Sequence, residues 1–295
     1  YGVRALFTAP TALRAIKKED PDGKAIAAHD ISTLRAFFLA GERSDPDSVR
    51  WAERYLERPV LDHWWQTETG WAIAGYPFGV EELAVKIGAA GRPMPGYDVQ
   101  ALDEGGEAMP AGELGNIVIR LPMPPGTLLT LWGNRERHHD GYLARYPGYY
   151  LTGDSGIVDA DGYVHIMSRI DDVINVAGHR LSTGQMEEVL SDHPDVVEAA
   201  VFGARDATKG QIPIGLVVPG NSFTGDEASL VAELIQRMRD ELGPVAAFRH
   251  CAVVRRLPKT RSGKTLRGTM RSIANGETWT MPASIDDPAI LDEIT

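Results

Sequence analysis

Four charged side chains in this sequence have the chemistry to hold a nucleotide. Asp154 lies in Thr-Gly-Asp, a glycine-flanked loop where a carboxylate can approach a sugar and accept hydrogen bonds from its hydroxyl groups. Arg169 and Arg180 carry guanidinium groups, whose fork of donors suits phosphate oxygens. Lys264 ends Arg-Ser-Gly-Lys, where the glycine and the small residue let a long cation reach into a site. Together these groups indicate a site for a phosphorylated sugar.

The segment 61–70, Leu-Asp-His-Trp-Trp-Gln-Thr-Glu-Thr-Gly, is the most unusual run in the chain. Trp64 and Trp65 are followed by amide, hydroxyl and carboxylate groups, which suits a pocket with an apolar wall and a polar, anion-facing rim. A core aromatic pair beside a polar loop would explain the same residues, because tryptophan mostly packs in protein interiors. The composition of the segment leaves both interpretations open.

The other candidate groups also have plainer interpretations. A single turn aspartate is usually structural, an arginine often forms a surface salt bridge, and a basic cluster is usually a solvated loop. Gly41-Glu42-Arg43 follows a buried strand, where it could face a nucleotide base or form a plain turn. His63 and His179 have no partner visible in the sequence, which disfavours a general-base role for either.

The order and separation of the motifs resemble those of the short-chain acyl-CoA synthetases among the adenylate-forming enzymes. The resemblance covers essentially the whole chain. Its strongest motifs are Trp-Trp-Gln-Thr-Glu-Thr-Gly at 64–70, Thr-Gly-Asp at 152–154, Ser-Arg-Ile-Asp-Asp-Val-Ile-Asn at 168–175, Ala-Gly-His-Arg at 177–180 and Pro-Lys-Thr-Arg-Ser-Gly-Lys at 258–264. Ser168 and Ala177 resemble propionyl-type members more than acetyl-type members.

The resemblance implies a nucleotide site, an acyl pocket and a metal ligand. The residues it assigns to the nucleotide are Gly41, Glu42, Asp62, His63, Trp64, Gln66, Thr67, Asp154, Arg169 and Arg180. Among them, Gln66 and Thr67 would face the phosphate. Trp65 would close the acyl pocket, and Glu68 would help to hold Mg²⁺.

The resemblance also implies a catalytic lysine, a hinge and a coenzyme A site. Lys264 would bond the reacting carboxylate and the α-phosphate, and Asp171 would be the hinge of a mobile C-terminal domain. The residues it assigns to coenzyme A are Ala177, Gly178, His179 and Arg239. ATP, Mg²⁺ and coenzyme A are therefore the expected cofactors and substrates, and enzymes that acetylate or deacetylate Lys264 are further expected partners.

We expect ATP-dependent activation of propionate, or of acetate, to acyl-AMP and then to acyl-CoA. The sequence does not separate propionate from acetate or butyrate, because one methylene contributes only about 1–3 kcal/mol in a pocket. The alternative is a truncated, non-catalytic nucleotide-binding or partner-binding protein, because no phosphate loop with its lysine occurs in the chain. A related adenylation domain with a carrier thiol is a third hypothesis, which the bulky Trp65 disfavours.

The start of the sequence indicates a fragment. Tyr1 is not an initiator methionine, and the pattern of the first residues indicates that the sequence begins inside a secondary-structure element. We expect the phosphate loop to lie upstream, and we expect the 295-residue chain to be inactive by itself.

The composition indicates a globular chain that acts on small molecules. Lys and Arg number 30 against 41 Asp and Glu, and the resulting net charge of -11 disfavours nucleic acids and acidic membranes as partners. The single Cys251 excludes an internal disulfide framework, and its apolar neighbours predict a buried strand position. No apolar run is long enough to span a membrane and no signal peptide is visible, so we expect a cytoplasmic protein.

The elements that must position these residues predict an α/β and α+β fold, the C-terminal part of the adenylate-forming fold. In residues 1–170, the patterns predict a strand at 31–40, a helix at 44–56 capped at its N-terminus, and a small antiparallel β subdomain over about 96–170. Asp161-Gly162 between two apolar runs predicts a hairpin in that subdomain.

Residues 171–295 read as a separate, mobile α+β domain. Ser182 with Gln185 predicts a capped helix through Leu190. Strands are predicted at 196–202, 211–218 and 250–255, and an amphipathic helix at about 228–242.

Overall fold

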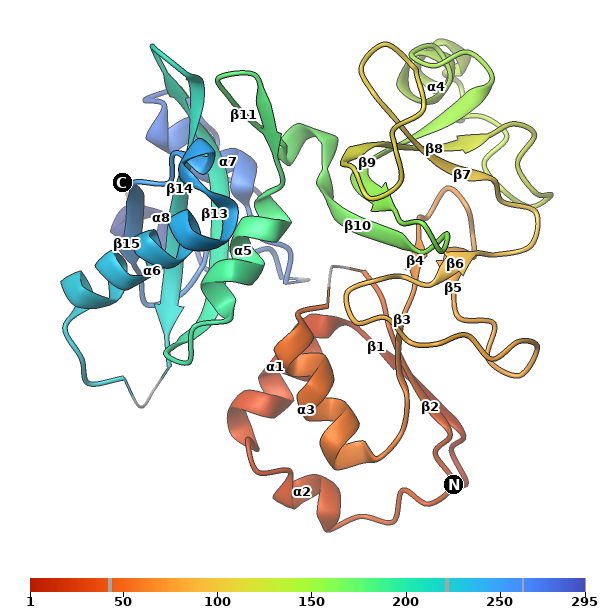
Figure 1. The fold of residues 1–295 in the computed structure, drawn as a ribbon, viewed down its shortest axis with the longest axis horizontal. Coiled ribbons are helices and arrows are strands. Elements are labelled where there is room, and N and C mark those ends of the chain that lie inside the picture. Colours follow the sequence, from red (N-terminus) through yellow and green to blue (C-terminus); the bar gives the residue numbers. More distant parts are fainter. Residues whose placement is uncertain (42–43, 221–222, 262, 295) are drawn as a thin grey trace. The chain divides into compact units, whose positions relative to one another are not determined.

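The structure is a computed structural model that describes residues 1–41, 44–220, 223–261 and 263–294. The described residues divide into two compact units, Tyr1–Ile170 and Asp171–Thr295 (Figure 1). Each unit has hydrophobic cores of its own, built from residues on its own helices and strands. The units are described separately.

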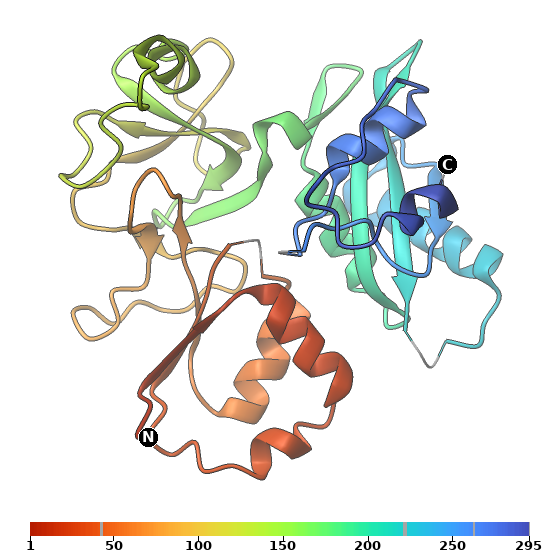
Figure 2. The same ribbon diagram turned by 180° about the vertical axis from the view of Figure 1, so that it is seen from behind.

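The first unit opens with a small parallel sheet covered by helices. Its elements are β1 (Ala5–Thr8), α1 (Pro10–Glu19), α2 (Lys24–Ala27), β2 (Ala36–Leu39), α3 (Pro46–Leu56) and β3 (Val60–Asp62). The strands are neighbours in the order β1-β2-β3, and α1 and α3 lie along the same side of them, as both views show (Figures 1 and 2). Leu13, Phe37 and Val49 lie in the core between these layers. Because the strands are parallel, the carboxyl ends of β2 and β3 meet at one edge.

Two boundaries in this layer differ from those predicted from the sequence. The strand predicted at 31–40 is only Ala36–Leu39, because residues before it form a turn in which Leu34 N donates to Ile31 O. The helix predicted from residue 44 begins at Pro46, and its cap is Asp45, whose carboxylate accepts from Ser48 N at 2.7 Å. A carboxylate one residue before a proline at the first helical position satisfies the normal requirements for a helix start.

The rest of the first unit consists of antiparallel sheets. One is β4 (Trp64–Trp65), β5 (Ala72–Gly75) and β6 (Arg92–Pro93); the other, in spatial order, is β10 (Val164–Arg169), β9 (Tyr149–Val158), β8 (Gly115–Arg120) and β7 (Val99–Leu102), with α4 (Arg135–Tyr142) between β8 and β9 in sequence. The hairpin predicted from Asp161-Gly162 is confirmed, because β9 and β10 pair antiparallel around that turn and Gly162 has φ +80°.

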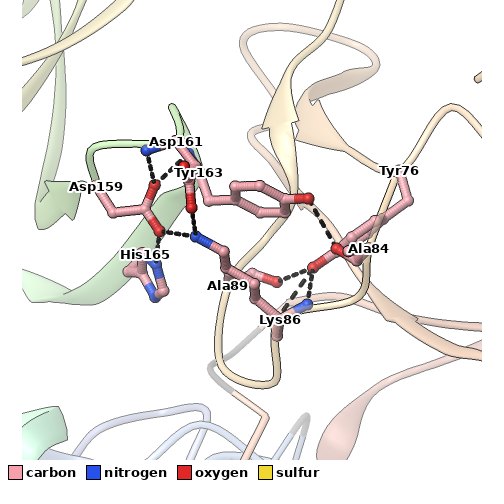
Figure 3. A network of polar contacts seen from close by, with 8 residues as sticks. All are labelled: Tyr76, Ala84, Lys86, Ala89, Asp159, Asp161, Tyr163 and His165. Atoms are coloured by element: carbon pink, nitrogen blue, oxygen red, sulfur yellow. Dashed lines mark hydrogen bonds and ion pairs between the residues drawn. The ribbon is translucent and has the colours of Figure 1, made fainter. Parts of the chain in front are cut away.

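A polar network fixes this hairpin to the loop between β5 and β6. Lys86 Nζ lies 2.6 Å from carboxylate oxygens of both Asp159 and Asp161 and 4.4 Å from the ring centre of Tyr163 (Figure 3). The Tyr163 hydroxyl donates to Ala84 O at 2.8 Å. The turn end of the hairpin is therefore anchored, and the strands that leave it carry Asp154 and Arg169.

The second unit is an antiparallel sheet with one parallel strand and helices. Its elements are the 3-10 turn η1 (Ile170–Asp172), β11 (Ile174–Val176), β12 (His179–Leu181), α5 (Thr183–Ser191), β13 (Val196–Asp206), β14 (Gly210–Pro219), α6 (Glu227–Leu242), the 3-10 turn η2 (Pro244–Ala246), β15 (His250–Val253), α7 (Arg267–Ala274) and α8 (Ala289–Glu293). The path β12-β11-β14-β13 forms the sheet, and β15 runs parallel to β14.

Most elements predicted for this unit are confirmed. Ser182 Oγ accepts from Gln185 N and caps α5, and the strands and the amphipathic helix lie where their patterns place them. The last strand ends at Val253 rather than at residue 255. Cys251 lies on that strand but is only half-buried, and burial raises the pKa of its thiol to about 11. None of the helices described is long and apolar enough to cross a bilayer.

Candidate active site

Asp154 is the centre of a polar cluster in the first unit. Its side chain is almost buried and lies within the strand β9, not in the loop expected from Thr-Gly-Asp. One carboxylate oxygen accepts from Trp64 Nε1 at 3.1 Å and from Gln66 Nε2 at 2.6 Å, and the other accepts from Arg169 Nη1 at 3.0 Å. The fold thus brings together three of the sequence motifs that are far apart along the chain.

The local backbone explains why Thr-Gly-Asp has this order. In the β9–β10 ladder Asp154 is the direct partner of Arg169, which sets the carboxylate beside the guanidinium. Gly153 has φ +74°, and a Cβ atom there would lie 2.5 Å from Arg169 Nη2. Only glycine leaves room for the arginine and accepts this backbone conformation without strain.

Asp154 and Arg169 form an ion pair whose two side chains differ in burial. Burial raises the pKa of Asp154, and the attraction of the Arg169 guanidinium opposes that rise. The Arg169 side chain is half-exposed at 48%, whereas that of Asp154 is 9% exposed. The arrangement therefore offers a fixed hydrogen-bond acceptor with an exposed cation beside it.

Gln66 holds Asp154 in place. Its amide nitrogen also donates to Thr152 O at 2.8 Å, and its amide oxygen accepts from the Tyr150 hydroxyl at 3.1 Å. Both ends of the amide are thus engaged within the protein, while Thr67 beside it is exposed. In this structure Gln66 positions the carboxylate, and the phosphate contact expected of Gln66 and Thr67 stays a prediction. Tyr150, fully buried, is a residue that the motif analysis missed because its role depends on a contact across 84 residues.

The adjacent tryptophans have different environments. Trp64 is 8% exposed and packs in the core with Ile73 and Tyr150, whereas Trp65 is 42% exposed. Successive side chains of a strand point to opposite faces, and both residues lie on β4. Each of the two interpretations of this pair therefore fits one residue, since Trp64 is a core residue and Trp65 offers its indole to the surroundings.

Glu68 lies on the same polar segment as Gln66. Its carboxylate accepts from the Tyr142 hydroxyl at 3.0 Å, and the Tyr142 ring stacks on Tyr150 with centroids 5.3 Å apart. Within the residues described, no group of three or more His, Cys, Asp or Glu could hold a metal ion. A single carboxylate still fits Mg²⁺, which proteins commonly hold with one or two carboxylates together with substrate phosphates.

The expected base-facing residues lie at the carboxyl edge of the parallel sheet. Gly41 follows β2, Asp62 ends β3 opposite Leu39, and His63 N donates to Leu39 O at 3.0 Å. Ligands bind at this edge of open α/β sheets, and the base contact of these residues stays a prediction. Glu42 lies outside the described residues.

His63 is packed between aromatic rings. Its imidazole centre is 5.4 Å from that of Phe7 and 6.0 Å from that of Phe38. Burial lowers the pKa of His63, and within the described structure its buried Nδ1 has no hydrogen-bond partner. The ring therefore stays neutral near pH 7.

The expected coenzyme A segment is an exposed hairpin tip in the second unit. Val176 pairs with His179 across a two-residue turn, in which Ala177 has φ +49° and Gly178 has φ +88°. Positive φ at both positions is the requirement of a type I′ turn. Among the residues described, nothing lies within 4 Å of a Cβ atom built on Gly178, and Ala177, Gly178 and His179 are all exposed. Arg180 follows on β12 and is half-buried.

Lys264 lies in a tight basic loop before α7. Thr260 N donates to Lys264 O at 2.8 Å, Lys264 N donates to Thr260 Oγ1 at 3.1 Å, and Gly263 has φ +87°. The Lys264 side chain is exposed, and no ion pair to it occurs in the described part of the chain. Ser262 lies outside that part.

Several cations close to Lys264 in the sequence are paired within the protein, whereas Arg261 is exposed on the same loop and the described residues include no ion pair to it. Lys259 Nζ is 2.9 Å from Glu198, Arg256 is 2.6 Å from Asp287, and Arg267 bonds Glu187. Arg261 and Lys264 are therefore the two exposed cations of this loop that a ligand could meet. The remaining predicted residues, Arg239 on α6 and Asp171 in η1, are exposed.

Comparisons with known proteins match both units. The family described as "AMP-binding enzyme" matches residues 1–126, and "AMP-binding enzyme C-terminal domain" matches residues 185–264. Among solved structures, the anthranilate CoA ligase AuaEII in complex with anthranoyl-AMP is 27% identical with a TM-score of 0.78, over 92% of this chain and 50% of that chain.

Curated relatives match over the full chain. An uncharacterized protein of Pseudomonas aeruginosa is 51% identical and covered to 47% of its length. Mitochondrial acyl-CoA synthetase short-chain family member 3 of Mus musculus is 43% identical and covered to 43%, and propionate–CoA ligase of Escherichia coli is 43% identical and covered to 48%. All three match 100% of this chain, which thus spans less than half the length of these relatives.

Proposed function

We propose, because this chain belongs to the adenylate-forming AMP-binding enzymes and to their short-chain acyl-CoA synthetase family, that the full-length protein activates propionate with ATP and transfers the acyl group to coenzyme A. A carboxylate oxygen of the acid attacks the α-phosphorus of ATP, and pyrophosphate leaves as the phosphoanhydride bond breaks. The sulfur of coenzyme A then attacks the acyl carbon, AMP leaves, and the thiol proton is released.

The observation that carries this proposal is the Asp154 cluster. A carboxylate fixed by Trp64, Gln66 and Arg169 is a preorganised acceptor for ribose hydroxyls, since its donors need not rearrange when the sugar arrives. The exposed Arg169 guanidinium adds a cation beside the same sugar. Glu68 would hold Mg²⁺, which supplies charge neutralisation of the triphosphate when bound.

Lys264 and the hairpin tip serve the two half-reactions in this proposal. The Lys264 ammonium stabilises the carboxylate and the α-phosphate during adenylation, and the tip at Ala177, Gly178 and His179 guides the pantetheine thiol during transfer. Rotation about Asp171 withdraws Lys264 from the reaction site and brings the hairpin tip there, a hinge change of the kind common in enzymes.

Because Lys264 is exposed, it is also a suitable substrate for an acetylating enzyme, which would remove the charge of the ammonium. A cytoplasmic location stays a prediction, because some relatives are mitochondrial.

The acid specificity is tested at Trp65. We expect the full-length protein to prefer propionate among C2 to C5 acids, and we expect Trp65→Gly to shift the preference toward butyrate and valerate by about tenfold or more, because removing the exposed indole opens space for added methylenes. Acid-dependent exchange of pyrophosphate into ATP measures this ranking. Trp71→Gly, which removes another exposed indole of the first unit, is the matched control. An unchanged ranking in Trp65→Gly would show that Trp65 does not line the acyl pocket.

Asp154→Asn separates nucleotide binding from stability. Because the fold raises the pKa of Asp154, the contribution of this carboxyl to the free energy of unfolding falls as the pH rises through its folded pKa. Asparagine keeps the volume but replaces one of the two acceptor oxygens by an NH2 group that faces a donor, so we expect the free energy of unfolding at pH 7 to fall by about 1–3 kcal/mol. The affinity for ATP should fall at least about tenfold, because a charged acceptor for the ribose is lost. Urea unfolding and a nucleotide titration measure the two quantities.

Asp159→Asn, on the same hairpin, is the control, because the fold shifts the pKa of Asp159 in the opposite direction from that of Asp154. Burial raises the pKa of Asp159, but hydrogen bonds from Lys86 and Tyr163 N outweigh it and hold that pKa well below the usual range. Its stabilising contribution is therefore present above about pH 4 and lost as the pH falls below it. This variant should lower stability at pH 7 and leave ATP affinity unchanged. Equal loss of ATP affinity in both variants would contradict a ribose contact at Asp154.

A further inference from the structure

The 3-10 turn η1, which contains the expected hinge, is held by an arginine of α7. Arg271 Nη2 donates to the backbone carbonyl of Asp171 at 2.8 Å and to the carboxylate of Asp172 at 3.2 Å. The residues lie 100 and 99 positions apart in the sequence. The Asp172 and Arg271 side chains are 18% and 29% exposed, so water screens this pair only in part.

A second arginine joins the same turn to the interior of the unit. Arg267, one helical turn before Arg271, donates to both carboxylate oxygens of Glu187 at 2.8 Å, and it lies 4.0 Å from Asp172. The Glu187 carboxylate also accepts from Val201 N at 2.8 Å, which links α5, β13 and α7. Residues four apart on a helix share a face, so both guanidinium groups are presented on one side of α7.

The helix that carries these arginines begins directly after the loop of Lys264. Leu266 N donates to Pro258 O at 2.9 Å and closes that loop, and α7 starts at the next residue. Met270 of α7 is buried in the core against β13 and β14. A chain of direct contacts therefore runs from the loop of Lys264 through α7 to the turn at Asp171 and Asp172.

We propose that Arg271 is a positioning residue that fixes the peptide plane between Asp171 and Asp172 to the second unit, so that rotation at the hinge is confined to the torsions of Asp171. The inference rests on the proposed function for its kinetic consequence. A carbonyl and a carboxylate held by one guanidinium cannot turn independently of α7. The backbone torsions that follow Asp171 therefore do not change when the second unit rotates. The torsions of Asp171 alone then determine where Lys264 and the hairpin tip are placed.

Without Arg271 the rotation would spread over several residues. Asp172 and Val173 would add torsions to the hinge, and each added torsion broadens the set of orientations that the second unit can adopt. Catalysis needs a narrow set, because a small misplacement of a reacting group can cost about 10²-fold in rate. Arg271 touches no substrate in this proposal, so its loss should reduce turnover without changing the affinity for ATP.

The test compares Arg271→Ala with Arg256→Ala in the full-length protein. Arg256 also pairs with a carboxylate of the second unit, that of Asp287, and has no bond to η1 in the described structure, so Arg256→Ala removes the same charge without affecting the turn. We expect Arg271→Ala to increase amide hydrogen exchange at residues 172–174 by about tenfold and to lower turnover by about tenfold, with KM for ATP within about twofold. Arg271→Lys should be intermediate, and Arg256→Ala should resemble the parent.

Unchanged exchange at 172–174 in Arg271→Ala, or the same increase in Arg256→Ala, would overturn the proposal. If Arg271→Ala unfolds the second unit, Arg271→Lys decides instead, because it keeps the charge and the side-chain stem but lacks the planar group that bonds both the Asp171 carbonyl and the Asp172 carboxylate; parent-like exchange in that variant counts against the clamp. Absence of acyl-AMP formation in the parent protein would refute the proposed function alone, since the exchange measurement needs no substrate.

Discussion

Lys264→Ala in the full-length protein should lower the rate of acyl-AMP formation by about 10²- to 10³-fold, the usual cost of removing one preorganised group that stabilises developing charge. The Lys264 ammonium is exposed and unpaired within the described structure, whereas Lys259, Arg256 and Arg267 around it are neutralised by carboxylates. The use of chemically supplied propionyl-AMP by coenzyme A should stay near the parental rate. Pyrophosphate release and thioester formation measure the two half-reactions separately.

Lys259→Ala is the matched control for this experiment. It removes the same charge from the same loop, but its ammonium is already paired with Glu198 at 2.9 Å. We expect adenylation to stay within about threefold of the parent in this variant, because the Lys259 ammonium is already held by Glu198 and its side chain is only 19% exposed. If Lys264→Ala slowed both half-reactions equally, Lys264 would be a general anion-binding or structural group.

Gly178→Leu should have the complementary effect. The side chain would project from the exposed tip of the β11–β12 hairpin, where no described residue lies within 4 Å of the added Cβ. We expect thioester formation from propionyl-AMP to fall by about 10²-fold, because a branched side chain would obstruct the pantetheine thiol and misplace its sulfur. Adenylation should be spared.

Gly162→Leu controls for backbone strain in this prediction. Gly162 has φ +80° and also has no neighbour within 4 Å of an added Cβ in the described part of the chain, but it lies in the β9–β10 turn. Both variants should lose stability by about 1–2 kcal/mol, since a residue with a side chain is disfavoured at positive φ. A loss of thioester formation in Gly162→Leu as large as that in Gly178→Leu would mean that strain, and not obstruction of coenzyme A, causes the effect.

Motifs in the sequence were sufficient to identify the family and the fold class. The match to the AMP-binding family and its C-terminal domain, and the likeness to a solved CoA ligase, confirm both. The reason is that these motifs are local: Thr-Gly-Asp, the paired aspartates and the basic loop each place their chemistry within a few residues. The roles of individual residues stay predictions, which the experiments above address.

The sequence by itself also determined the elements whose signals are local. Ser182 with Gln185 gave the start of α5, and Asp161-Gly162 gave the β9–β10 hairpin, because caps and turns depend on hydrogen bonds between near neighbours. Element ends were less well determined. The start of α3 at Pro46 depended on a choice between adjacent capping residues, Ser44 and Asp45, and both are compatible with a helix.

Only the tertiary structure decided which side chains meet. Gln66 bonds Asp154 across 88 residues, Lys86 bonds Asp159 across 73, and Arg271 bonds the carbonyl of Asp171 across 100. Such pairs depend on strand register and on the packing of whole elements, and no local sequence motif indicates either of them. The sequence therefore determined which groups this protein can use, and the packing decided that Gln66 positions a carboxylate and that Trp64 and Trp65 face different surroundings.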